Sequence, residues 1–159
     1  MDSRLRVVVL QLQSVDLVSK NTEQVLDLLS PIEAEDHPTL VCLPENALYM
    51  RLKEGERIEG LSLKDECFGR LSKVAREKNL ILHVGSVPLN WQGKLANSSV
   101  LISPDGQVSA SYQKVHLFDI ELEGERPIRE SDVFHHGSGA ASIDVSDWKF
   151  GQTICYDLR

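Results

Sequence analysis

Apolar runs and an amphipathic segment alternate along the first part of the chain. Residues 6–13, RVVVLQLQ, begin as a continuous apolar run, which is typical of a mostly buried strand. Residues 19–33 carry apolar side chains at helical spacing. Residues 39–43, TLVCL, form a second apolar run that stops at Pro44, which cannot donate to a ladder. The pattern predicts strand, helix and strand.

The alternation continues once more after a polar stretch. Residues 46–61 are polar and contain two glycines, so we expect a loop. Residues 62–79 have a second helical pattern, with Asn79 as a plausible C-terminal stop. Residues 80–87, LILHVGSV, are predicted to form a third buried strand.

The last part of the chain has the pattern of paired strands. Residues 97–102 and 107–112 flank Ser-Pro-Asp-Gly, in which proline presets φ and glycine accepts a positive φ, so they are predicted to form a hairpin. Residues 119–139 are expected to be loop, and residues 141–145 and 148–154 a last pair of strands. The order predicts an α/β fold with a mixed sheet and helices on one face. A second sheet is the natural cover for the other face.

Composition and charge narrow the function classes. The 159 residues suggest one domain, and 42% of them are apolar, which is ordinary for a globular core. A net charge of −7 without a Lys/Arg cluster argues against nucleic-acid binding, and no apolar run is long enough for a membrane span. Without a signal-peptide pattern, we expect a cytoplasmic protein whose three cysteines are reduced.

Three chemically useful side chains follow predicted strand ends. Cys155 is a potential nucleophile, Glu45 a potential base for its proton, and Lys114 a cation that could stabilise an oxyanion. Spacing alone does not decide the matter, because glutamates and lysines at strand ends are usually solvated surface residues. We also expect Lys114 to lower the pKa of Cys155, and Cys42 to be buried and inert.

The local sequences around these residues are more specific. Leu-Pro-Glu-Asn, Lys-Val-His-Leu-Phe-Asp, Arg-Glu-Ser-Asp-Val-Phe and Ile-Cys-Tyr-Asp-Leu-Arg occur in this order. The chain thereby resembles the Nit branch of the nitrilase (carbon–nitrogen hydrolase) superfamily, from the first strand to Arg159. The resemblance implies a nitrilase-type four-layer α-β-β-α sandwich, of which residues 1–159 would be the N-terminal portion. Family members continue for about another hundred residues, so we expect a C-terminally incomplete carbon–nitrogen hydrolase domain.

The resemblance also assigns roles to residues. It implies that Cys155 is the nucleophile, Glu45 the general base, and Lys114 the cation facing the oxyanion. The Tyr156 backbone N–H would be a second oxyanion donor, and Glu130 matches a second glutamate that positions substrate and lysine. Taken without the family, Glu130 is more simply a loop carboxylate.

Other candidates carry less weight. Tyr49 and Met50, after Glu45, are candidates for the substrate-pocket wall. His135 and His136 could suggest a metal, but neighbouring histidines on an extended segment are expected to point in opposite directions, and no cysteine or histidine lies at ligand spacing.

The implied reaction is hydrolysis of a small linear amide, of the ω-amide type, to carboxylate and ammonia through a cysteine thioester. The resemblance implies no metal or organic cofactor, a small-molecule amide as substrate, and a homodimer or higher homo-oligomer of the complete protein. A nitrile or an N-carbamoyl compound could replace the amide. The alternative from another class is a truncated, non-catalytic homologue that binds a partner or small molecule.

Overall fold

A five-stranded mixed sheet is the centre of the fold in the computed structural model, which describes residues 4–53, 55–124 and 126–159. The strands lie in the order β1-β2-β3-β4-β5, and two short hairpins, β6-β7 and β8-β9, stand apart from them. The elements are β1 (Arg6–Val9), α1 (Val18–Leu29), β2 (Thr39–Leu43), α2 (Glu66–Glu77), β3 (Ile81–Trp91), β4 (Lys94–Ile102), β5 (Val108–Gln113), β6 (Asp119–Ile120), β7 (Ile128–Arg129), the 3-10 helix η1 (Glu130–Asp132), β8 (Ser142–Val145), β9 (Trp148–Gly151) and the 3-10 helix η2 (Cys155–Leu158).

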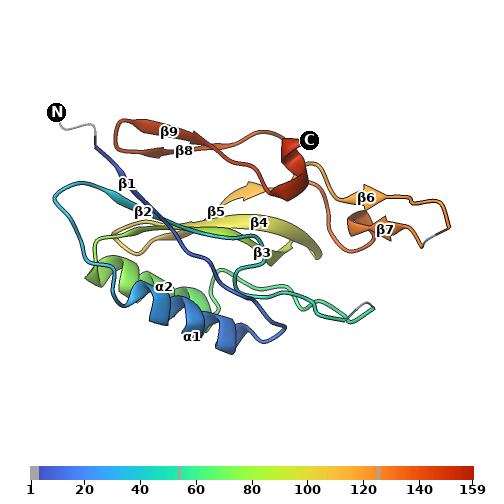
Figure 1. The fold of residues 1–159 in the computed structure, drawn as a ribbon, viewed down its shortest axis with the longest axis horizontal. Coiled ribbons are helices and arrows are strands. Elements are labelled where there is room, and N and C mark those ends of the chain that lie inside the picture. The colour runs from blue at the N-terminus through green and yellow to red at the C-terminus, as the bar shows by residue number, and fades with distance from the viewer. Residues whose placement is uncertain (1–3, 54, 125) are drawn as a thin grey trace.

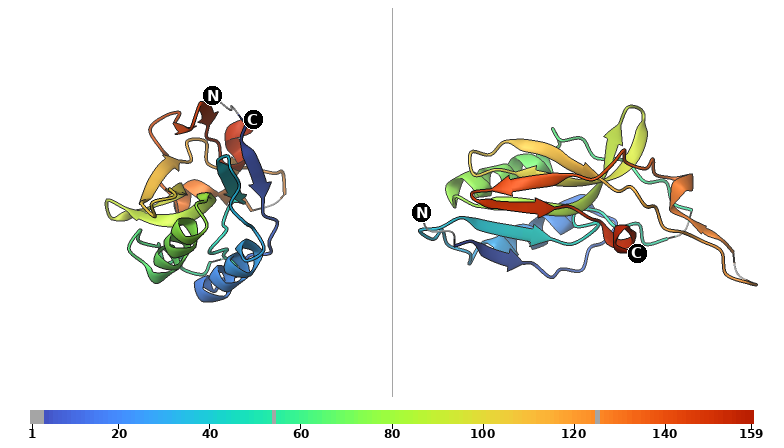
Figure 2. Two further views of the ribbon diagram at one scale, coloured as in Figure 1. Left: turned by 90° about the vertical axis from the view of Figure 1, so that its left-hand side faces the viewer. Right: turned by 90° about the horizontal axis from the view of Figure 1, so that it is seen from above.

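The layers follow the predicted α/β order. β1, β2 and β3 run parallel, whereas β3-β4 and β4-β5 are antiparallel. Both α1 and α2 cover one face of the sheet, and the β8-β9 hairpin lies over the other (Figures 1 and 2). Neither of these two helices, which are the α-helices of the described residues, is long and apolar enough to cross a membrane. The predicted mixed sheet with helices on one face is therefore confirmed.

The core lies between the helices and the sheet. Its fully buried side chains come from both helices and from the central strands, and they include Val25, Leu29, Phe68, Leu71, Leu82, Val84 and Ile102. These are the apolar positions of the two helical patterns and of the buried runs, so burial of one apolar face per helix holds the layers together.

Strand pairing extends the structure beyond the sequence prediction at two places. β3 continues to Trp91 instead of ending near residue 87, because it pairs with β4 through a tight turn in which Gln92 and Gly93 have positive φ. Pro88 is tolerated there because it lies beyond the end of β2, where no strand needs its missing N–H. The expected loop 119–139 contains the β6-β7 pair and η1.

A β-bulge in β3 brings the end of β2 close to it. The register shifts between Val84 and Val87, and a Cβ on Gly85 would lie 2.0 Å from the Leu43 carbonyl oxygen. Ser86 holds the chain after β2, since its Oγ accepts a hydrogen bond from the Asn46 N–H at 3.1 Å and its carbonyl accepts one from the Ala47 N–H at 3.0 Å. The bulge thereby fixes the turn that carries Glu45.

Candidate active site

Strand direction places the predicted residues at one edge of the sheet. β5 runs in the same direction as β2, because it is related to the parallel β2-β3 pair by two antiparallel pairings. The ends of β2 and β5 therefore lie at the same edge, and Glu45 and Lys114 follow those ends. Both line an open cavity of about 960 Å³ together with Glu130 and Cys155.

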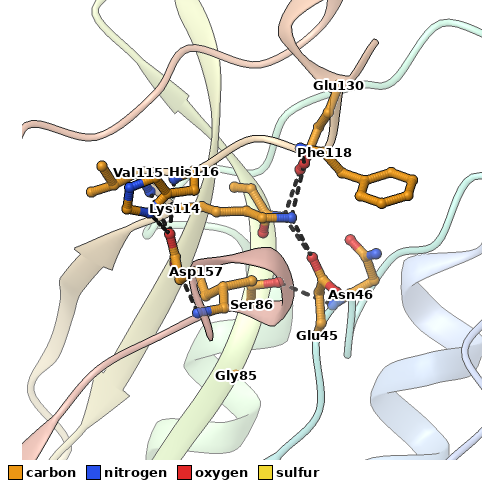
Figure 3. A network of polar contacts seen from close by, with 12 residues as sticks. Glu45, Asn46, Gly85, Ser86, Lys114, Val115, His116, Phe118, Glu130 and Asp157 are labelled. Carbon is orange, nitrogen blue, oxygen red and sulfur yellow. Dashed lines mark hydrogen bonds and ion pairs between the residues drawn. The ribbon is translucent and has the colours of Figure 1, made fainter. Parts of the chain in front are cut away.

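Lys114 joins the two glutamates. Its Nζ lies 2.8 Å from Glu130 Oε2 and 3.3 Å from Glu45 Oε1, and its side chain is only 2% exposed (Figure 3). Burial lowers the pKa of Lys114, but the hydrogen bond to Glu130 and the charges of both glutamates outweigh burial, and the net pKa is raised. The ammonium therefore stays charged at neutral pH.

Glu130 is held on both carboxylate oxygens. Oε2 accepts a hydrogen bond from the Phe118 backbone N–H at 2.7 Å in addition to the Lys114 ammonium. Oε1 accepts one from the Asn97 amide at 3.1 Å. The Glu130 N–H in turn donates to the Phe118 carbonyl at 3.2 Å. The structure thus places Glu130 in a fixed contact with Lys114 and not on a solvated loop.

Cys155 does not sit at the end of a strand. β9 ends at Gly151, and Cys155 opens η2 with a φ of 48°. A positive φ is uncommon for a residue with a side chain and is maintained only where surrounding contacts hold it. The sequence pattern predicted a strand over residues 148–154 and gave no sign of this turn, because its apolar positions also suit a strand.

The pKa of the Cys155 thiol is raised, which makes the expected lowering by Lys114 wrong as a net direction. Burial raises it first, and the charge of Glu45 and a hydrogen bond to that carboxylate raise it further. Lys114 does lower the pKa, but it is outweighed, with Glu130 adding to the rise. At neutral pH the thiol keeps its proton and lies against a carboxylate that can take it.

Asp157 ties the turn of Cys155 to the segment that carries Lys114. Its carboxylate accepts hydrogen bonds from the Tyr112 hydroxyl at 2.8 Å and the Ile154 N–H at 2.9 Å. It also accepts them from the Val115 and His116 N–H groups at 3.3 and 2.8 Å (Figure 3). Nδ1 of the His116 ring also lies 3.1 Å from Asp157 Oδ1. Burial raises the pKa of Asp157, but these donors lower it more, so the group stays ionised.

The other sequence candidates lie at or beside the cavity. Tyr49 and Met50 line it, and Met50 is 45% exposed. The Tyr156 ring packs edge-to-face on Phe118, which lines the cavity, with centroids 5.3 Å apart. A role of these residues in substrate binding remains a prediction.

The side chains of His135 and His136 lie against each other. Their rings stack, with centroids 5.0 Å apart, so the expectation that they point in opposite directions was wrong. Among the described residues, no group of three His, Cys, Asp or Glu side chains is arranged to hold a metal ion.

Sequence reasoning missed Asn97 and Phe118. Asn97, in β4, is 3% exposed and donates to Glu45 Oε1 at 2.9 Å as well as to Glu130. A polar amide in an otherwise buried strand was the available signal, since such groups need partners. Phe118 contributes through its backbone N–H, which no side-chain pattern reveals.

Comparison with known proteins identifies the family. The carbon–nitrogen hydrolase family model matches residues 6–159. The omega-amidase NIT2 of Mus musculus is 33% identical over 162 residues, which cover 99% of this chain and 56% of the mouse protein. The human omega-amidase NIT2 is also 33% identical, with 97% of this chain and 55% of that protein covered. This chain spans about half the length of these curated relatives.

Solved structures share the fold. The C. elegans NitFhit protein superposes with a TM-score of 0.78 at 25% identity, covering 96% of this chain and 38% of that one. The nitrilase-type α/β architecture and the matched family model agree with one another. The chain belongs to the carbon–nitrogen hydrolase family.

Proposed function

We propose that the protein hydrolyses a small linear amide of the ω-amide type to a carboxylate and ammonia, through a thioester on Cys155. The observation that carries this proposal is the contact of Lys114 with both Glu45 and Glu130, beside the Cys155 thiol in one cavity. Base, cation and nucleophile are thus adjacent. The names of the mouse and human relatives favour ω-amides as the substrate class.

Acylation begins with transfer of the thiol proton to Glu45. The Cys155 sulfur attacks the amide carbonyl carbon, and the carbonyl oxygen becomes an oxyanion. An ammonium has three N–H donors, and two of those of Lys114 point to Glu45 and Glu130, which leaves the third for the oxyanion. The Tyr156 N–H is the second donor, since the first N–H groups of a helix have no partner within it. Collapse breaks the C–N bond, and Glu45 returns its proton to the departing ammonia.

Deacylation uses the same base. Glu45 takes a proton from a water molecule, whose oxygen attacks the thioester carbonyl carbon. The second oxyanion forms at the same position and collapses with release of the carboxylic acid. The Cys155 sulfur leaves as a thiolate and recovers the proton held by Glu45. One amide and one water give one carboxylic acid and one ammonia, which exchange a proton in solution.

The raised pKa of Cys155 fits a base-dependent mechanism. A neutral thiol reacts slowly until its proton is removed, so attack requires Glu45 at the moment of reaction. The Glu45 carboxylate, 3.3 Å from the Lys114 ammonium, is the group that accepts this proton in the proposed step.

The proposal is tested on the full-length protein with the monoamide of a short dicarboxylic acid. We expect ammonia release in the wild type, no turnover in Cys155→Ala, and a loss of about 100-fold or more in kcat for Lys114→Ala. Glu45→Gln should slow both formation and hydrolysis of an acyl adduct, measured by intact-protein mass spectrometry. Cys67→Ala, which changes a buried thiol in α2, is the matched control and should keep full turnover.

Two results would overturn the proposal. Ammonia release that persists in Cys155→Ala would exclude thiol catalysis. A wild type without turnover on ω-amides, nitriles and N-carbamoyl compounds would favour a non-catalytic binding protein.

A further inference from the structure

Asn97 bridges the two carboxylates of the site. Its Nδ2 donates to Glu45 Oε1 at 2.9 Å and to Glu130 Oε1 at 3.1 Å. Its backbone carbonyl accepts a hydrogen bond from the Lys114 N–H at 2.9 Å. One residue of β4 thus contacts all three charged residues that surround Cys155.

The bridge assigns different tasks to the four carboxylate oxygens. Glu130 Oε1 is engaged by Asn97, and Glu130 Oε2 by Lys114 and the Phe118 N–H. Glu45 Oε1 is engaged by Asn97 and Lys114. Among the contacts of the described residues, Glu45 Oε2 is the carboxylate oxygen that Asn97 and Lys114 leave open.

The orientation of the Asn97 amide leaves its oxygen without a hydrogen bond among the described residues, and the two neighbouring carboxylates account for this orientation. Asn97 Oδ1 is buried and has no hydrogen-bond partner among the described residues. Turning the amide over would place its oxygen against the carboxylate oxygens of Glu45 and Glu130, which is repulsive. The amide therefore uses both of its N–H groups on the carboxylates and leaves its oxygen unpaired.

We propose that Asn97 is a positioning residue, a neutral bridge that holds Glu45 by Oε1 so that Oε2 faces the Cys155 thiol and exchanges its proton. An anionic side chain at this position would add repulsion, because Lys114 supplies one positive charge to two carboxylates. This inference rests on the proposed cysteine mechanism, in which Glu45 is the base.

The first test needs no turnover, so it remains informative if the amidase proposal fails. The pH midpoint of Cys155 alkylation by iodoacetamide is measured, because Glu45, Lys114 and Glu130 all act on this thiol. Glu45→Gln should shift the pH midpoint of alkylation when it is introduced into the wild-type protein. It should shift the midpoint less when it is introduced into the Asn97→Ala variant, in which Asn97 no longer holds Glu45. Asn90→Ala is the matched control, because Asn90 is an exposed amide on β3 that donates to the Gly60 carbonyl.

An equal shift from Glu45→Gln in the wild-type and Asn97→Ala backgrounds would overturn the proposal, since a purely structural asparagine would leave the coupling intact.

The second test uses Asn97→Asp, which keeps the volume of the side chain and covers the case in which Asn97→Ala does not fold. A third carboxylate beside Lys114 should move the Cys155 midpoint to higher pH. With an ω-amide, kcat should fall about 10-fold or more at little change in KM, and the acidic limb of kcat/KM should move to higher pH. An unchanged midpoint together with an unchanged acidic limb would contradict the positioning role.

Discussion

At the scale of single residues, the Cys155 thiol lies between opposing charges. Burial, Glu45 and Glu130 favour the neutral thiol, while Lys114 favours the thiolate, and the first group prevails. In the proposed reaction Lys114 therefore serves to stabilise the oxyanion and not a resting thiolate. In the same reaction the thiol stays protonated until Glu45 removes its proton.

This balance predicts the pH dependence of alkylation. A raised pKa means that thiolate forms only as the pH rises above the ordinary cysteine value of about 8.5. Glu45→Gln removes a charge that raises the pKa, so its midpoint should move to lower pH, whereas Lys114→Met should move it to higher pH. Iodoacetamide rates read by mass spectrometry measure both. Cys67, with a pKa raised to about 11 by burial, should label slowly in every variant.

A wild-type midpoint below the ordinary value, or shifts in the same direction for both variants, would contradict this account of the thiol.

Residue identities in the site were predictable where local sequence carries them. Glu45, Lys114, Glu130 and Cys155 each lie in a distinctive short segment, and the structure brings all four to one cavity. Asn97 was not predictable, because its partners lie 52 and 33 residues away and its importance comes from contacts alone. The direction of the pKa shift of Cys155 was also predicted wrongly, because burial and the distances to Glu45, Glu130 and Lys114 decide whether the pKa rises or falls.

At the scale of elements, the bulge in β3 couples strand pairing to the site. Gly85 and Ser86 lie where the register shifts, and they contact the backbone on both sides of Glu45. A second shift in β4, between Ser99 and Val100, follows soon after Asn97. Bulges commonly redirect side chains next to active sites, and here both irregular strands carry the residues that hold Glu45.

Two alanine substitutions should therefore act in opposite directions. Gly85→Ala would place a Cβ 2.0 Å from the Leu43 carbonyl oxygen, so we expect a loss of about 1–3 kcal/mol of stability and a displaced Glu45. Gly69→Ala lies on the exposed side of α2 with nothing within 4 Å, and should gain about 0.5–1 kcal/mol. Urea unfolding compares the two.

Ammonia release should fall in Gly85→Ala and stay unchanged in Gly69→Ala. If both variants were equally stable and equally active, the close approach of β2 to β3 would not matter for the site.

Element types were predictable and their ends were not. Periodicity found α1, α2 and the five strands of the sheet, because burial of one face imposes it. The extension of β3 to Trp91 and the β6-β7 pair depend on a partner strand. The local sequence of each strand does not indicate which strand it pairs with. The 3-10 turn of Cys155 contains Asp157, whose carboxylate is held by the distant Val115 and His116 N–H groups as well as by the Ile154 N–H.

At the scale of the molecule, β1 exposes apolar side chains at an edge of the sheet. Val8 packs against the core, so Val7 and Val9 point to the face away from the helices, and they are 51% and 76% exposed. Apolar side chains on an edge strand favour association with other chains.

We therefore expect the 159-residue chain to associate. Val9→Lys should shift size-exclusion profiles toward the monomer and leave the thermal transition nearly unchanged, since Val9 makes little buried contact. Leu17→Lys is the control, because it also replaces an exposed apolar side chain by a charged one, at a 55% exposed position before α1. It should shift the size-exclusion profile less. A monodisperse monomer in the unmodified chain would refute this expectation.

The hydrogen bonds of Asp157 also determine when the site can exist. Those to Tyr112, Val115 and His116 join residues 41 to 45 positions apart, and the contact of Lys114 with Glu45 spans 69 positions. Closing such long loops costs entropy, which the pairing of β3 with β4 and of β4 with β5 must first reduce. During synthesis, Cys155 and Asp157 leave the ribosome after every strand of the sheet. Cys155 consequently approaches Glu45 only on a sheet that has already formed, so in a nascent or partly unfolded chain its thiol lacks the neighbouring Glu45 and Lys114.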